Sequence, residues 1–377
     1  MTARKLLPAF ALALAMALAA GTAAAFPLPA VDGPPARAGC PRAPVAPVID
    51  GHLDDAAWTH WLRLDTDIEG DAQPRPRLGT DVATAWDDSF FYVAARLAEP
   101  HVWATYDRRD AVIYHENDFE VFLDPDGDNH LYYELEINAL GTVWDLLLVR
   151  PYRDGGPAID AWDIAGLRAA VHVDGTLNDP SDRDEGWSLE LAFPWTVLAQ
   201  AAGRPAPPAP GDIWRVNFSR VQWRTEPAPG GYAKIVDPAT HAPLPEDNWV
   251  WSPQGLIAMH YPERWGELVF LAAGQDERDA FAGNPEHDAI LMAGTLMPVY
   301  YRQREFHAVH GRYAADPAEL GLEPDTLPMR APGRVLPLGP GQVFTLAGGA
   351  DWFTARLVTS VVTATVDHEG RLRRTAP

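Results

Sequence analysis

Acidic side chains recur at every second position along two neighbouring stretches of the chain. The stretches are 118–124 and 131–138, and their alternating polar residues are Asp118, Glu120, Glu134, Glu136 and Asn138. A period of two is typical of a half-buried strand, so these side chains are expected on one face, away from the core. Because like charges opposite each other destabilise a sheet, such a face suggests a cation, an arginine or a polar ligand. The alternative is a solvated outer face of an acidic protein.

Three antiparallel strands are needed to position these residues. The alternation predicts strands over 118–124, 131–137 and 142–148. Turns join them at 125–128 (PDGD) and 139–141 (ALG), where Pro presets φ and Gly tolerates positive φ.

The first of these turns is itself a candidate metal site. Asp124, Asp126 and Asp128 are spaced by two around Gly127. Hard cations such as calcium are bound by several carboxylate oxygens, so the three aspartates are candidate calcium ligands. The loop departs from an EF-hand, whose glycine comes after the third acid. A plain Asp-Gly turn would account for the same residues.

Composition excludes several classes of partner and cofactor. The 377 residues include 30 Lys and Arg against 52 Asp and Glu, a formal charge of −22. This balance argues against nucleic acid and against docking on anionic lipid. We find no Gly-x-Ser-x-Gly elbow, zinc-type His pair or Gly-rich phosphate loop, so we expect no nucleotide and nominate no catalytic residue. His260 follows Met259, but Cys-x-x-Cys-His is missing, and we expect no haem.

The first 25 residues are typical of a secretory signal peptide. Arg4 and Lys5 precede an apolar run over 6–20, and 23–25 (AAA) is a small-residue cleavage site. We expect cleavage before Phe26 and a secreted or periplasmic protein that does not span the membrane. A retained N-terminal anchor is the alternative. Cys40 is the only cysteine, so no intramolecular disulfide is expected, and its thiol is expected to be buried or free.

The rest of the chain divides into three parts. Residues 26–44 are rich in Pro and Ala and are predicted to be a linker. Short strands separated by turns over 45–271 predict an all-β antiparallel β-sandwich, jelly-roll-like. Residues 272–377 are predicted to be a small α+β appendage. It should hold a helix over 286–311 ended by Gly311, a helical turn at 317–320 and a small sheet over 342–367.

Five sequence blocks in the sandwich region share their order with one family. The blocks are 49–58 (IDGHLDDAAW), 86–93 (WDDSFFYV), 117–124 (NDFEVFLD), 186–195 (GWSLELAFPW) and 265–270 (WGELVF). With these blocks the domain resembles the family 9 carbohydrate-binding modules found beside xylanases, and more closely the broad family 9-like group of exported proteins. The resemblance implies a β-sandwich that binds sugars, often with structural calcium.

The resemblance also implies positions for the sugar site. Such modules hold a sugar ring between two aromatic faces, while acidic and amide groups accept hydrogen bonds from its hydroxyls. The first clamping aromatic falls at Tyr114 and the hydroxyl-binding glutamate at Glu120. Glu136 stands where the family has a basic residue. The second clamping Trp falls near Met259 or His260, so this chain departs from the pattern there.

These observations give one leading hypothesis and two alternatives. The expected function is an exported carbohydrate-binding protein that assists capture or degradation of polysaccharide, with a saccharide as its ligand and its protein partners open. The alternatives are a glycoside hydrolase that uses the sandwich to hold substrate, and a non-catalytic envelope module whose appendage contacts protein. Trp251 is included as an exposed aromatic that could replace the missing clamp, although it could instead pack against the sandwich edge. The candidate ligand-binding residues are Tyr114, Glu120, Glu136, Asn138, Trp251 and His260.

Overall fold

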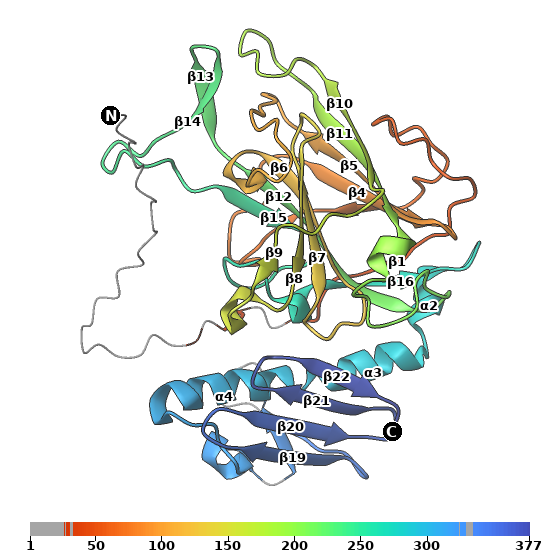
Figure 1. The fold of residues 1–377 in the computed structure, drawn as a ribbon, viewed down its shortest axis with the longest axis vertical. Helices are drawn as coiled ribbons and strands as arrows, with labels where there is room; N and C mark the ends of the chain where they lie inside the picture. The colour runs from red at the N-terminus through yellow and green to blue at the C-terminus, as the bar shows by residue number, and fades with distance from the viewer. Residues whose placement is uncertain (1–25, 27, 31–32, 324, 329–334) are drawn as a thin grey trace, which may run out of the picture.

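The computed structural model describes residues 26, 28–30, 33–323, 325–328 and 335–377. The predicted signal peptide over 1–25 lies outside the described residues. Two mainly antiparallel sheets form a β-sandwich, and a smaller α+β region follows it in the chain (Figure 1). The predicted fold class, a β-sandwich with a small α+β appendage, is confirmed.

The first sheet, called sheet A, carries the acidic strands. Its order is β1 (Arg37–Cys40), β16 (Gly266–Phe270), β12 (Ile213–Gln222), β6 (Asp118–Asp124), β7 (Tyr132–Ile137), β8 (Val143–Leu148) and β9 (Ala158–Ile159), with β15 (Asp247–Val250) beside β12 and β3 (Thr66–Asp67) beside β15. The predicted strands over 118–124, 131–137 and 142–148 are therefore confirmed as β6, β7 and β8.

The second sheet, called sheet B, closes the sandwich. Its order is β10 (Arg168–Asp174), β11 (Gly186–Pro194), β5 (Phe90–Ala98), β4 (Thr80–Trp86) and β2 (Trp61–Arg63). The inward side chains of both sheets form one core. It includes Phe119, Val121 and Leu123 from β6, and Leu189 and Leu191 from β11. Burial of these alternating apolar residues fixes the register, since a slip by one residue would exchange the two faces.

The predicted linker over 26–44 needs correction at its C-terminal end. Residues 37–40 form β1, which pairs in parallel with β16 at the edge of sheet A. The stretch resembles a linker because Ala38, Gly39 and Cys40 are small, yet a Cβ at Gly39 would lie 2.6 Å from Leu271, so a small residue is needed where this strand packs. Cys40 ends this strand as a free, buried thiol whose pKa is raised by burial.

Short helical turns and one hairpin connect the strands. They are η1 (Ile113–His115), η2 (Tyr152–Asp154), α1 (Trp195–Leu198), η3 (Pro262–Arg264) and the hairpin of β13 (Thr225–Ala228) and β14 (Gly231–Lys234). The hairpin projects away from the sandwich in Figure 1. No helix among the described residues has the length and apolar character that crossing a bilayer would require.

The C-terminal region packs helices against a four-stranded antiparallel sheet (Figure 1, blue). Its elements are α2 (Glu277–Phe281), α3 (Pro285–Gly294), α4 (Met297–His310), η4 (Pro317–Leu320), β17 (Thr326–Pro328), β18 (Val335–Pro337), β19 (Val343–Gly348), β20 (Phe353–Val358), β21 (Thr363–Asp367) and β22 (Leu372–Thr375). The helix predicted over 286–311 is divided into α3 and α4 between Gly294 and Met297. Gly311 does end α4, with a φ of 66°.

A buried network of charges joins this region to the sandwich. Arg153 in η2 donates two hydrogen bonds to Glu263 in η3, at 2.7 and 2.9 Å. From α4, the Tyr301 hydroxyl donates to Glu263 and Arg304 donates to Asp154 at 2.6 Å. Burial opposes ionisation of Glu263, but Arg153 and Tyr301 hold its pKa below the ordinary value. The C-terminal region is therefore attached through specific buried contacts rather than by its connecting chain alone.

Candidate functional site

Four carboxylates come together on the outer face of sheet A. We call Asp118, Glu120, Glu134 and Glu136 the acidic cluster. Glu120 on β6 lies directly opposite Glu136 on β7 in the strand register. Asp118, Glu120 and Glu136 each place one carboxylate oxygen within 4.8 Å of the others. The period-two pattern thus predicted correctly that these side chains share a face.

The acidic cluster is buried, so the alternative of a solvated acidic face is wrong. Its four side chains are only 0 to 5% exposed. Burial raises the pKa of Glu120 to about 7. In Asp118, Glu134 and Glu136, burial and then the neighbouring carboxylates raise the pKa. Each of these groups is therefore destabilised in its charged form.

Apolar side chains on the same face of the sheet lie beside the acidic cluster. Glu134 lies between Phe122 and Leu146 in the register of β6, β7 and β8. These two residues belong to an outer apolar cluster that includes Met259 and Trp265 from the segment after β15. Distant parts of the chain therefore cover a face that the alternation alone leaves open to water.

Tyr114 lies at the acidic cluster, as the family resemblance implies. Its backbone N–H donates to Glu136 at 2.8 Å, and its ring, 39% exposed, stacks beside Trp144 with centroids 6.2 Å apart. Trp144 stands directly opposite Glu136 on β8. After burial, the charge of Glu136 is the largest influence that raises the pKa of the Tyr114 hydroxyl. A partly exposed aromatic surface therefore adjoins the buried acids.

A second aromatic pair lies near the same acids. The Tyr152 and His260 rings meet edge to face at 4.4 Å, and Tyr152 is 50% exposed. Burial and then Glu134 raise the pKa of Tyr152 to about 12. His260 is hydrogen-bonded to Tyr132 at 2.9 Å, and burial lowers its pKa to about 3, so its ring is neutral near pH 7. Met259 is buried in the outer apolar cluster and is only 8% exposed.

Asn138 holds the site together but is not free to bind a ligand. Its amide N–H groups donate to Tyr106 and Glu116, and its oxygen accepts from Leu140 and Thr142. It is fully buried, and these four hydrogen bonds use its whole capacity. The prediction of Asn138 as a ligand-binding residue is therefore corrected to a structural role.

Trp251 does not lie at the acidic cluster. It is buried in the main core, where its ring packs on Phe218 with centroids 5.8 Å apart. It also covers Gly266 so closely that a Cβ at that glycine would lie 2.3 Å from the ring. The alternative that Trp251 packs within the sandwich is the one that the structure shows.

The aspartate turn lies against the C-terminal region. Asp124 accepts hydrogen bonds from the backbone N–H groups of Gly127 and Asn129, and Asp128 accepts one from Arg371 at 2.6 Å. The carboxylates of Asp124, Asp126 and Asp128 converge within 4.8 Å. Calcium binding at this turn stays a prediction, with an arginine already paired to one of the three acids.

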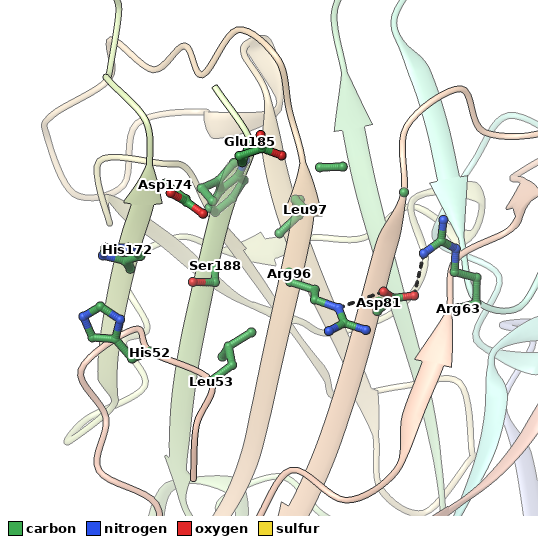
Figure 2. Close-up of a pocket in the computed structure, with 14 residues that line it drawn as sticks. His52, Leu53, Arg63, Asp81, Arg96, Leu97, His172, Asp174, Glu185 and Ser188 are labelled. Atoms are coloured by element: carbon green, nitrogen blue, oxygen red, sulfur yellow. Dashed lines mark hydrogen bonds and ion pairs between the residues drawn. The ribbon is translucent and has the colours of Figure 1, made fainter. Parts of the chain in front are cut away.

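A separate cavity of 640 Å³ lies on the outer face of sheet B (Figure 2). Figure 2 shows Arg63 and Arg96 both reaching Asp81, at 2.7 and 2.8 Å. The rings of His52 and His172 lie 4.2 Å apart at its other side. Charges of both signs line this cavity, and both arginines are already paired with Asp81, so the cavity is the weaker candidate site.

The segment that contains the acidic cluster is similar to a known protein family. Residues 49–206 match the model of the family described as "Carbohydrate family 9 binding domain-like". The resemblance is confirmed over that segment. The family 9-like segment contains Tyr114, the acidic cluster, Trp144 and Tyr152, whereas Trp251 and His260 lie beyond the match.

Two curated relatives align with part of the chain. They are an exoglucanase of Acetivibrio thermocellus and an endo-1,4-beta-xylanase of Thermoanaerobacterium saccharolyticum, each 25% identical over 162 residues. The alignment covers 42% of this chain but only 12% of either relative. The chain therefore matches a small part of each enzyme.

Solved structures give weaker likenesses. A family 9 module of Caldicellulosiruptor kristjanssonii in complex with cellotriose is 15% identical, with a TM-score of 0.41, covering 63% of this chain and 96% of that one. A putative carbohydrate-binding protein of Bacteroides uniformis is 17% identical, with a TM-score of 0.45, covering 63% of this chain and 99% of that one.

Sequence reasoning missed two aromatic residues of the site. Trp144 could have been found from the sequence, because the alternation along β8 places its side chain on the same face of the sheet as the acids of β7. Tyr152 gives no such signal, because it lies in the η2 turn and its proximity to Glu134 depends on the tertiary fold.

Proposed function

We propose that this protein binds a saccharide at the acidic cluster, with Tyr114, Trp144 and Tyr152 as its aromatic surfaces. One observation carries the proposal: partly exposed aromatic rings adjoin buried carboxylates inside the segment that matches the family 9-like model. Sugar rings present C–H groups that pack on aromatic faces, and their hydroxyls donate to carboxylate oxygens. Both kinds of group are available within one part of sheet A.

The proposal assigns a different role to each residue. Tyr114 and Trp144 would pack on a sugar ring, because their rings stack next to each other and are not fully buried. Glu120 would accept a hydroxyl hydrogen bond, since its Oε2 atom has no partner among the described residues. Glu136 accepts from Tyr114 and so holds the aromatic residue in place. The face differs from the family pattern in carrying Glu136 where a basic residue is expected.

A glycan array with the purified protein tests the proposal. We expect binding to soluble or immobilised plant-type polysaccharides and their oligosaccharides, measured with and without added calcium. Binding to none of the saccharides under either condition would contradict the proposal. Turnover of xylan or cello-oligosaccharides by the same preparation would instead support the hydrolase alternative.

We further propose that the protein is exported and contributes to polysaccharide capture or degradation outside the cytoplasm. The charged and apolar pattern over 1–25 supports export. Amino-terminal sequencing of the mature protein should begin at Phe26. A mature protein that still begins at Met1 would count against cleavage.

A further inference from the structure

Three groups of acids in the described residues bring carboxylate oxygens within 4.8 Å of one another. They are the Asp110, Asp145 and Asp163 group, the Asp118, Glu120 and Glu136 group, and the Asp124, Asp126 and Asp128 group. The first contains an arginine partner, because Arg109 pairs with both Asp145 and Asp163. The third contains one as well, because Arg371 pairs with Asp128 at 2.6 Å. Positive charge is thus built into two of the three groups.

The Asp118, Glu120 and Glu136 group has no such ion pair among the described residues. Arg220 lies on the adjacent strand β12, and its charge reaches Asp118. Its guanidinium, however, pairs with Glu99 at 2.9 Å and donates to Thr80 at 3.0 Å. The positive charge of Arg220 is therefore held on the other side of the strand.

Unpartnered oxygens are the second observation. Asp118 Oδ2, Glu120 Oε2 and the neighbouring Glu134 Oε2 are buried, and none of them has a hydrogen-bond partner in the part of the chain that the structure describes. Glu134 is not one of the three converging residues. It is 5% exposed, and the negative charge of Glu120 acts on its carboxylate. A buried polar atom without a partner costs about 1–3 kcal/mol, and more when it is charged. Several such atoms in one place indicate a positively charged partner.

The spacing fits a divalent cation with oxygen ligands. Two oxygens on opposite sides of a calcium ion are roughly 4.6–5.2 Å apart, since each bond is about 2.3–2.6 Å. One oxygen from each converging carboxylate lies within 4.8 Å of the other two, which is close enough for all three to bind one such ion. Ser219, directly opposite Glu120 on β12, adds a fully buried hydroxyl oxygen. Carboxylate and hydroxyl oxygens form the hard ligand set that calcium prefers.

We propose that the acidic cluster binds one divalent cation of the calcium type, with Asp118, Glu120 and Glu136 as its ligands. Ser219 supplies a neutral oxygen, and Glu134 adds negative charge outside the ligand set. The cation takes the place of the basic residue that this face lacks. This inference goes beyond saccharide binding, because the cation needs no sugar to bind. The Glu120 carboxylate can serve both partners, since its two oxygens offer about four lone-pair positions.

Cation titrations without any saccharide test the inference. The full-length mature protein is freed of metal with a chelator and titrated with Ca²⁺ by calorimetry and with Tb³⁺ by luminescence. Trp144 stands opposite Glu136 and should sensitise the emission of Tb³⁺ bound there. We expect Ca²⁺ to raise the melting temperature of the wild type, because the cation binds the folded state.

Matched variants locate the cation. The double variant Glu120→Gln with Glu136→Gln keeps side-chain size and removes two negative charges. It should bind Ca²⁺ at the acidic cluster at least about tenfold more weakly and lose the Trp-sensitised emission, and Ca²⁺ should raise its melting temperature less than that of the wild type. Asp163→Asn changes another acidic group and should leave all three measurements unchanged.

Three results would overturn the inference. The first is a wild type that binds neither Ca²⁺ nor Tb³⁺, and the second is a double variant with wild-type affinity. The third is loss of binding in Asp126→Asn alone, which would move the cation to the aspartate turn. Because the double variant relieves repulsion between facing carboxylates, we expect it to fold, and its metal-free melting temperature should not fall below that of the wild type. Saccharide binding is measured separately, so its failure would leave these results intact.

Discussion

Replacing Arg153 with methionine should lower the free energy of unfolding by about 3–5 kcal/mol. The Arg153 guanidinium is buried and forms two hydrogen bonds to Glu263, whose side chain is equally buried. Removing one partner leaves the other charge uncompensated away from water, which is the costly way to break a buried ion pair. The Arg153 side chain also lies 4.1 Å above the Tyr261 ring, a contact that methionine replaces only in part.

Denaturant unfolding measures this effect, with Arg373→Met as the matched control. Arg373 also forms an ion pair, at 3.4 Å from Asp367, but more than half of its side chain is exposed. Exposed pairs are worth about 0–1 kcal/mol, so the control should unfold almost like the wild type. Similar losses in both variants would show that the buried network does not attach the C-terminal region to the sandwich.

Replacing Glu116 with alanine should cost about 1–3 kcal/mol of stability and should also weaken saccharide binding. The buried Glu116 carboxylate accepts hydrogen bonds from the backbone N–H groups of Thr105 and Tyr106, from the Thr105 hydroxyl and from Asn138. Of these donors only Asn138 is fully buried, and a buried donor left without a partner costs about 1–3 kcal/mol. These hydrogen bonds hold the segment that leads to Tyr114. Loss of the Glu116 carboxylate should therefore also displace the Tyr114 ring from the acidic cluster.

Asp107→Ala is the control, because Asp107 is an exposed acid in the same segment. Such a surface change should alter stability by no more than about 0.5 kcal/mol. Unfolding curves and saccharide titrations of both variants test the argument. If Glu116→Ala lowers stability but leaves affinity unchanged, the segment does not position the binding surface.

The strands and the shared face of the acids could be predicted from the sequence, because both depend on local alternation. Phe119 and Val121 mark the inward face of β6, so Glu120 must point outward. The burial of that outward face could not be predicted. The outer apolar cluster on that face includes Met259 and Trp265, which are more than a hundred residues away in the chain and have no local alternation that places them there.

The contacts that the candidate site residues make could not be predicted from the sequence either. Asp128 has a turn-like local sequence, yet its partner Arg371 lies 243 residues further along the chain. Trp251 looked available because it lies near a proline-rich loop, but β15 places Val250 on the outer face and Trp251 in the core. Asn138 fits the alternating pattern of the acidic face, but its side-chain amide is already hydrogen-bonded to neighbouring loops. Residue type and spacing identify a face, whereas availability depends on contacts made at long range.

Calorimetric titration of Glu120→Ala tests the central claim most directly. The ligand is the saccharide that binds best on the array, and the control is Glu226→Ala on the projecting hairpin of β13 and β14 (Figure 1). Loss of a hydrogen bond to a charged group costs about 1.5–3 kcal/mol. We therefore predict an affinity about ten- to a hundredfold lower for Glu120→Ala and unchanged for Glu226→Ala. Equal affinities for the wild type and Glu120→Ala would contradict a saccharide site at the acidic cluster.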